Sequence, residues 1–96
     1  MFMAIVNFPP VKQGKEQDFF DWFEWSNQGF AGHKGFIRRC LLKAMTGDEY
    51  AAIVEHESHD TFMAMNNSAF HKEAGKRIQP LFDGVPKPHF YEVIRE

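Results

Sequence analysis

The chain has 96 residues, enough for one compact domain, residues 1–96, and too few for two domains of ordinary size. Its formal net charge is −2 with acidic and basic residues interleaved, so the basic stripe typical of nucleic-acid-binding proteins is missing. No long apolar run and no charged signal region occur, which predicts a cytoplasmic protein without a membrane span. Phenylalanine occurs 11 times, which favours a well-filled core and an apolar surface that a partner subunit covers.

The first third of the chain predicts a strand followed by a helix. Residues 3–8 are apolar and precede Pro9, whose nitrogen cannot donate a sheet hydrogen bond, so a strand should end there. Residues 16–30 carry apolar side chains at helical spacing, with the acidic side chains on the opposite side. This pattern predicts a helix with one buried face, formed by Phe19, Trp22, Phe23, Ser26 and Phe30.

The remaining residues predict a hairpin, a helical region and a last strand. Residues 35–44 and 50–58 are apolar runs joined by a short turn that contains glycine, which is typical of a β-hairpin. Ser58 is suited to cap one helix and Asn67-Ser68 to cap a second, so the helical region should be interrupted at Asn67-Ser68. Residues 89–94 alternate apolar and polar side chains and predict a strand.

This order of elements predicts an α+β domain of the ferredoxin-like βαββαβ type, in which a four-stranded antiparallel sheet carries two helices on one face. Every predicted strand has apolar residues of both parities, so the second face of the sheet also needs a cover. A single domain of this length has no spare helix for that purpose. We therefore expect a homodimer in which the two sheets face each other.

Two polar side chains in apolar surroundings are candidate catalytic residues. His71 borders the apolar stripe of the second helical region, where an imidazole can serve as a haem ligand, a general base or a polar anchor for a substrate. Asn7 shares strand parity with Met3 and Ile5, and a buried amide without partners costs about 1–3 kcal/mol. Asn7 could orient an oxygen or a carbonyl group, or only tie down the end of its strand, and His71 could equally be an ordinary helix-flank residue.

Five other side chains are candidates for contact with a substrate. Trp25 lies out of phase with the buried face of its helix, so it either walls a pocket or forms a half-exposed lid, whereas Trp22 lies at the edge of that face. Met65 and Phe70 belong to the second helical region, where a thioether and a ring suit a flat apolar ligand or simply the core. His33 lies in a glycine-rich loop, and loops often carry function.

Other chemistry-bearing residues give weaker signals. His56 and His59 stand among acidic residues, but neighbouring strand residues point to opposite faces, so we predict no metal site. For the same reason at most one of Arg38 and Arg39 can meet an anionic ligand. Cys40 has no second cysteine to pair with and is expected to be a small hydrophobic residue.

The segments KGFIRRCLL, YAAIVEHES, NSAFHKEAGKRIQPLF and FYEVI together resemble the antibiotic-biosynthesis monooxygenase family, whose members are dimeric α+β barrels. The resemblance covers nearly the whole chain. It implies oxygenation of a flat aromatic or conjugated small molecule, with no cofactor required, in a pocket between the sheet and the helices. His71 would accept a proton from the substrate and Asn7 would hold a carbonyl or dioxygen, with Trp22, Trp25, Met65, Phe70 and His33 around them.

The haem-degrading branch of this family uses an Asn on the first strand, a Trp in the second helical region and an axial His further along. Asn7 matches the first of these, the Trp position falls near Met65, and the axial position falls near Ala74 or Gly75. His71 lies about one helical turn earlier. Two alternatives therefore stay open, a haem-binding or haem-degrading protein with a displaced His ligand and a non-catalytic ligand-binding module.

Overall fold

All four strands pair into a single antiparallel sheet in the order β2-β3-β1-β4, as a computed structural model of residues 1–96 shows. The strands are β1 (Phe2–Asn7), β2 (Phe36–Lys43), β3 (Tyr50–His56) and β4 (Lys87–Glu92). The helices are α1 (Glu16–Phe30), α2 (His59–Asn66) and α3 (Ala69–Ile78), and a 3₁₀ turn, η1 (Gln79–Leu81), follows α3. The predicted ferredoxin-like arrangement is confirmed.

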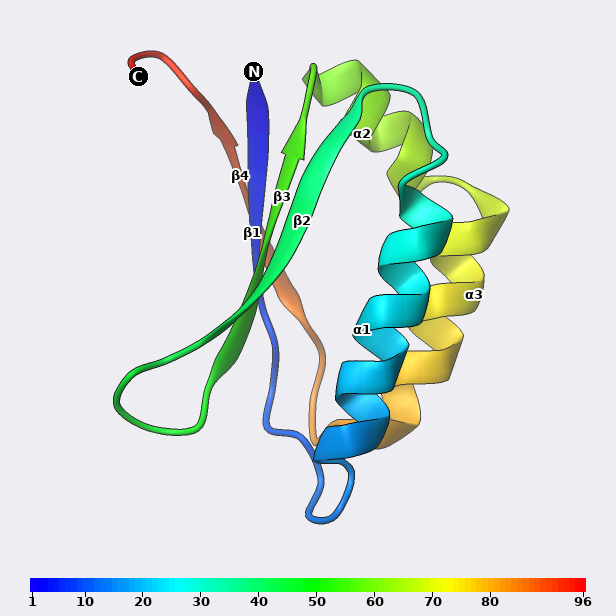
Figure 1. The fold of residues 1–96 in the computed structure, drawn as a ribbon, viewed down its shortest axis with the longest axis vertical. Coiled ribbons are helices and arrows are strands. Elements are labelled where there is room, and N and C mark those ends of the chain that lie inside the picture. The colour runs from blue at the N-terminus through cyan, green and yellow to red at the C-terminus, as the bar shows by residue number, and fades with distance from the viewer.

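The helices all lie on one face of the sheet, with α1 and α3 side by side (Figure 1). We predicted two helices on this face, and the second is divided into α2 and α3 at the expected interruption. The Ser58 hydroxyl accepts a hydrogen bond from the Thr61 amide at 3.1 Å, and the Ser68 hydroxyl accepts one from the His71 amide at 3.2 Å. Both serines therefore cap helices, as their positions had predicted.

The last strand begins and ends two residues earlier than predicted. β4 lies at the edge of the sheet and pairs only with β1, where the final register pair joins Phe2 to Glu92. Beyond Glu92 one more backbone hydrogen bond follows, from the Val93 amide to the Met1 carbonyl oxygen at 2.9 Å. β1 begins at Phe2, so the strand ends there although the alternation of side chains continues. Pro88 is tolerated inside β4 because an edge strand does not need every N–H for pairing.

The helix-facing side of the sheet and the apolar face of α1 form the core. Buried residues alternate along β1 and β3, and the predicted buried face of α1 is confirmed apart from Trp22, which is only partly buried. The largest fully buried side chains are Phe19, Ser26 and His56. None of the helices combines the length and the hydropathy that a membrane crossing needs.

The opposite face of the sheet carries no helix (Figure 1). The register places Met3, Ile5 and Ile53 on this face, since their neighbours Ala4 and Val54 are buried against the helices. Leu42 and Tyr91 extend the same surface and are 41% and 50% exposed. The apolar side chains on this second face of the sheet therefore have no cover within one chain.

The two longer helices approach closely at Gly29. A Cβ atom placed on Gly29 would lie 1.9 Å from the Cζ atom of Phe70, so the Phe70 ring occupies the space that any larger residue of α1 would need. Phe70 also packs edge-on against Phe30, with ring centroids 5.0 Å apart. The contact between α1 and α3 thus depends on the absence of a side chain at one position.

Candidate functional site

A cavity of about 340 Å³ lies between the helix-facing side of the sheet and the helices. This volume falls within the range of small-molecule sites. Its walls are mostly apolar, and they include the aromatic side chains and the methionine of Phe8, Trp22, Phe30, Phe62, Phe90 and Met65. The polar side chains that reach it are Arg39, Asn66 and His71. The cavity therefore combines an apolar, largely aromatic interior with a few polar groups.

Three of the predicted site residues, Trp22, Met65 and His71, meet at this cavity. The indole N–H of Trp22 donates to the carbonyl oxygen of Ala74 at 2.9 Å, which joins α1 to α3 beside the cavity. The Trp22 ring stacks on Phe19 with centroids 6.1 Å apart and an interplanar angle of 12°. These contacts fix the indole as part of the wall.

Asn7 does not line the cavity, and its predicted place in a pocket between the sheet and the helices is wrong. It pairs with Ala51 and Lys87 at the end of β1, its side chain is exposed, and the preceding residue, Val6, faces the helices instead. Apolar residues occur at both odd and even positions of β1, so the sequence does not show which face is buried. The helices cover the face that carries Phe2 and Ala4, and Asn7 lies on the other face.

Trp25, Phe70 and His33 do not line the cavity either, although we placed them around the substrate. The Arg77 guanidinium lies 4.2 Å from the centroid of the Trp25 ring, and the Phe70 ring is 5.0 Å away. His33 Nδ1 lies 3.3 Å from the Phe30 carbonyl oxygen. These three side chains pack in and beside the contact between α1 and α3, because Phe70 is drawn into the gap at Gly29.

His71 reaches the cavity from the first turn of α3. Its ring packs near Phe30, with centroids 5.9 Å apart, and neither ring nitrogen has a hydrogen-bond partner in the protein. Burial lowers the pKa of His71 below its ordinary value, and the positive charge of Arg39 lowers it further. His71 is therefore a neutral imidazole at pH 7 and free to accept a proton.

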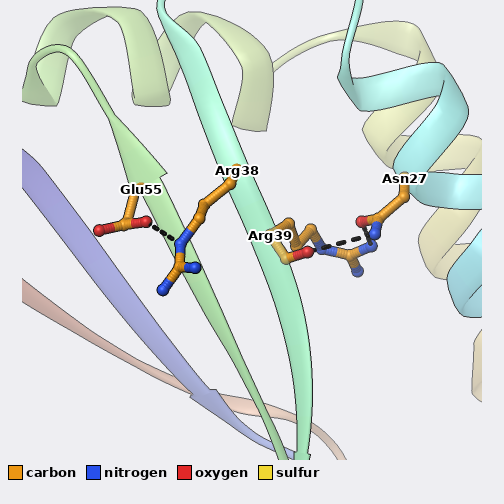
Figure 2. A network of polar contacts seen from close by, with 4 residues as sticks. All are labelled: Asn27, Arg38, Arg39 and Glu55. Carbon is orange, nitrogen blue, oxygen red and sulfur yellow. Dashed lines mark hydrogen bonds and ion pairs between the residues drawn. The ribbon is translucent and has the colours of Figure 1, made fainter.

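Arg39 and Asn66 line the cavity although neither was among the predicted site residues, and Arg39 is the one of the two neighbouring arginines that reaches it. Its Nη1 donates to Ser26 Oγ at 2.8 Å and to Asn27 Oδ1 at 2.9 Å, both on α1. Figure 2 shows that Arg39 points toward α1 while Arg38 points to the opposite side, where it pairs with Glu55. Burial lowers the pKa of Arg39 to about 9, which still leaves a cation at neutral pH.

His56 is buried, and its ring is satisfied inside the fold. Its Nδ1 lies 2.9 Å from Thr61 Oγ1 and its Nε2 lies 3.3 Å from Met65 Sδ. Burial is the main cause that lowers the pKa of His56, and the charge of His33 adds to it while Glu57 opposes it. Because Met65 forms part of the cavity wall, His56 supports the site from behind.

We expect the stability of the protein to fall when the pH drops below the ordinary histidine value of about 6.5. The folded state holds His56 and His71 with lowered pKa values, so below that pH the unfolded state binds more protons and is favoured. The urea midpoint should be lower at about pH 5.5 than at about pH 7.5. This difference should shrink in His56→Gln and persist in His59→Gln, whose side chain is exposed. Equal pH dependence in both variants would contradict the assignment.

The cavity does not reproduce the haem-binding pattern described above. Met65 lies in its wall where that pattern has a Trp, Ala74 and Gly75 offer no ligand atom, and Asn7 lies on the other side of the sheet. His71 is the only imidazole that lines the cavity. The residues present therefore do not fit a haem site of that kind.

No family model matches the sequence, and no curated protein matches it. Solved structures do match, including a Nitrosomonas europaea protein described provisionally as an antibiotic biosynthesis monooxygenase, with a TM-score of 0.85 and 14% identity over 99% of this chain and 100% of that one. A Bordetella bronchiseptica protein with the same description has a TM-score of 0.84 and 22% identity, over 98% of this chain and 97% of that one.

SnoaB, a cofactor-independent oxygenase from Streptomyces nogalater, has a TM-score of 0.83 and 20% identity over 99% of this chain and 95% of that one. Identities this low establish a shared fold and leave activity to be argued from the site. The chain therefore has the ferredoxin-like fold of the antibiotic biosynthesis monooxygenase-type proteins, as the resemblance of its four sequence segments to that family had predicted.

Proposed function

We propose that the protein is a small oxygenase that acts, without a cofactor, on a flat aromatic or conjugated molecule held between the sheet and the helices. The observation that carries this proposal is the neutral His71 imidazole, with no protein partner, in an apolar cavity. Removal of water from such a cavity strengthens the effect of each polar group that remains. The cofactor-independent oxygenase SnoaB, which shares the fold, supports the same reading.

His71 would take the proton of a substrate hydroxyl, and the resulting electron-rich anion would deliver electrons to dioxygen. For a phenol with a hydrogen opposite the hydroxyl, one dioxygen would give the para-quinone and one water. The substrate supplies all four electrons, so no external reductant is needed. Asn66 lines the cavity with an amide that makes no hydrogen bond in the protein, so in our proposal it replaces Asn7 as the group that holds a carbonyl or dioxygen.

The direct test is oxygen uptake by the purified protein with 1-naphthol and with a larger hydroxyanthracene, followed by identification of the quinone by mass spectrometry. Isotopically labelled dioxygen should place one labelled atom in the product. Saturable binding of these ligands without oxygen uptake would instead identify a non-catalytic binding module. A one-per-subunit shift of the haemin Soret band that is lost in His71→Ala would favour the haem alternative.

We further propose that the protein is a homodimer formed through the uncovered face of the sheet. This face presents apolar side chains from all four strands around the Ile5–Ile53 pair. Arg38 and Glu55 neutralise each other there, and Lys87 lies at its edge, opposite Asn7. Burial of this surface supplies the favourable free energy of association. The wild-type protein should therefore sediment at twice the mass of the 11.2 kDa chain.

Ile53→Lys should convert the dimer to a monomer, because it would place two cations in the centre of the interface. Sedimentation equilibrium measures the change directly. Val85→Lys is the matched control, since Val85 is 63% exposed and lies in the loop before β4, outside the sheet face. A wild-type protein that sediments as a monomer would overturn the proposed interface.

A further inference from the structure

We propose that Arg39 makes the cavity selective for an aromatic carboxylic acid, that is, a flat ring system that carries one carboxylate. This inference rests on the proposed function, because it specifies the substrate class of the same cavity. Arg39 is one of three polar residues in an otherwise apolar lining, and it is the only cation among them.

The guanidinium of Arg39 has no carboxylate partner. The three ion pairs of the chain are Lys15–Asp18, Arg38–Glu55 and Arg77–Glu73, and none involves Arg39. Its hydrogen bonds go to a hydroxyl oxygen and an amide oxygen, which carry no net charge. A partly buried cation without a counter-ion is unfavourable, and a negatively charged ligand would supply the missing charge.

The hydrogen bonds of Arg39 leave one edge of the guanidinium unused. Both of its bonds to α1 come from Nη1, whereas Nε and Nη2 have no acceptor in the protein. No fully buried side-chain nitrogen or oxygen lacks a partner, so Nε and Nη2 keep accessible surface, and Arg39 is a residue that lines the cavity. The Nε–Nη2 edge presents two parallel N–H groups, which match the two oxygens of a carboxylate.

The aromatic rings around Arg39 hold this edge in place. The guanidinium carbon lies 4.2 Å from the centroid of Phe23, 5.0 Å from that of Phe30 and 5.3 Å from that of Trp22. Ring faces attract a cation without consuming its N–H groups. If Arg39 served only to link β2 to α1, the hydrogen bonds of Nη1 would be enough. The unused Nε–Nη2 edge is better explained by a planar ligand with two oxygens that lies beside Trp22 and Phe30.

Isothermal titration with 2-naphthoate and 2-naphthamide tests the inference, because the two ligands have nearly the same shape and differ in charge. At pH 7 the carboxyl group is ionised. Wild-type protein should bind the naphthoate about tenfold to a hundredfold more tightly than the amide, as expected for charge-assisted hydrogen bonds. In Arg39→Gln the two affinities should become equal to within about threefold, since glutamine keeps one donor and loses the charge.

Arg38→Gln is the matched control, because Arg38 is the neighbouring arginine on the opposite face of the sheet and should leave the preference intact (Figure 2). Arg39→Lys keeps the charge without the paired donors and should give an intermediate preference, so it serves if the glutamine variant does not fold. Equal binding of both ligands by the wild type, or binding of neither, overturns the inference. A carboxylate preference without any oxygen uptake would uphold it and refute the oxygenase instead.

Discussion

Replacement of His71 by glutamine is expected to lower kcat for the oxygenation of a hydroxynaphthalene by about 10²–10⁴-fold, the usual contribution of a general base. Glutamine fills similar space and can still form a hydrogen bond, but it cannot take up the proton of the substrate. Because the 2-naphthoate site is assigned to Arg39, the affinity for this ligand should change by no more than about threefold. Stopped-flow oxygen consumption and calorimetry separate the two effects.

The neighbouring Lys72→Gln variant is the control, since Lys72 is exposed on the same helix and does not line the cavity. The pH profile gives an independent check. The lowered pKa of His71 keeps the imidazole neutral below the ordinary histidine range, so kcat/KM should fall only at a pH below about 6.5. Full activity in His71→Gln would remove His71 from the chemistry.

Replacement of Gly29 by alanine is expected to destabilise the protein by about 1–3 kcal/mol, as overpacking of a tight contact usually does. The new methyl group would collide with the Phe70 ring, which cannot move freely because it also packs against Phe30 and Trp25. Alanine gains up to about 1 kcal/mol over glycine inside a helix, and this gain is smaller than the expected strain. Chemical denaturation monitored by circular dichroism measures the difference.

Gly75→Ala in α3 is the matched control, because a Cβ atom there meets no atom within 4 Å and Gly75 has ordinary helical backbone angles. This variant should be as stable as the wild type or more stable by up to about 1 kcal/mol. Loss of stability in Gly75→Ala with none in Gly29→Ala would contradict the close approach of α1 and α3. Phe70→Ala should restore tolerance to alanine at position 29, although it leaves a cavity of its own.

The helices were more predictable than the strands, for a physical reason. Only one face of α1 is buried, so its apolar spacing identifies Phe19, Phe23 and Phe30 without ambiguity. Ser58 and Ser68 act within one turn of their own helices, so local sequence is sufficient to predict the caps. The sheet has apolar side chains on both faces, and alternation alone cannot say which face the helices cover.

This ambiguity explains the misplacement of Asn7 and the open choice between Arg38 and Arg39. Asn7 was assigned to the helix side with the parity of Ile5, whereas the helices cover the other parity. In β2 a bulge between Phe36 and Arg38 inserts Ile37 as an extra residue. Strict alternation from Phe36, which faces the helices, would place Arg38 on the helix side of the sheet. Because of the bulge, Arg39 lies on the helix side and Arg38 on the opposite face.

The positions of the two tryptophans give the protein a built-in optical signal. Trp22 lines the cavity and is held by its bond to the Ala74 carbonyl, whereas Trp25 lies outside the cavity beneath Arg77. Any occupant of the cavity would alter the surroundings of one indole and leave the other unchanged. A protein in which Trp25 is replaced by phenylalanine would retain a single fluorophore at the site, so unlabelled compounds could be screened by emission alone.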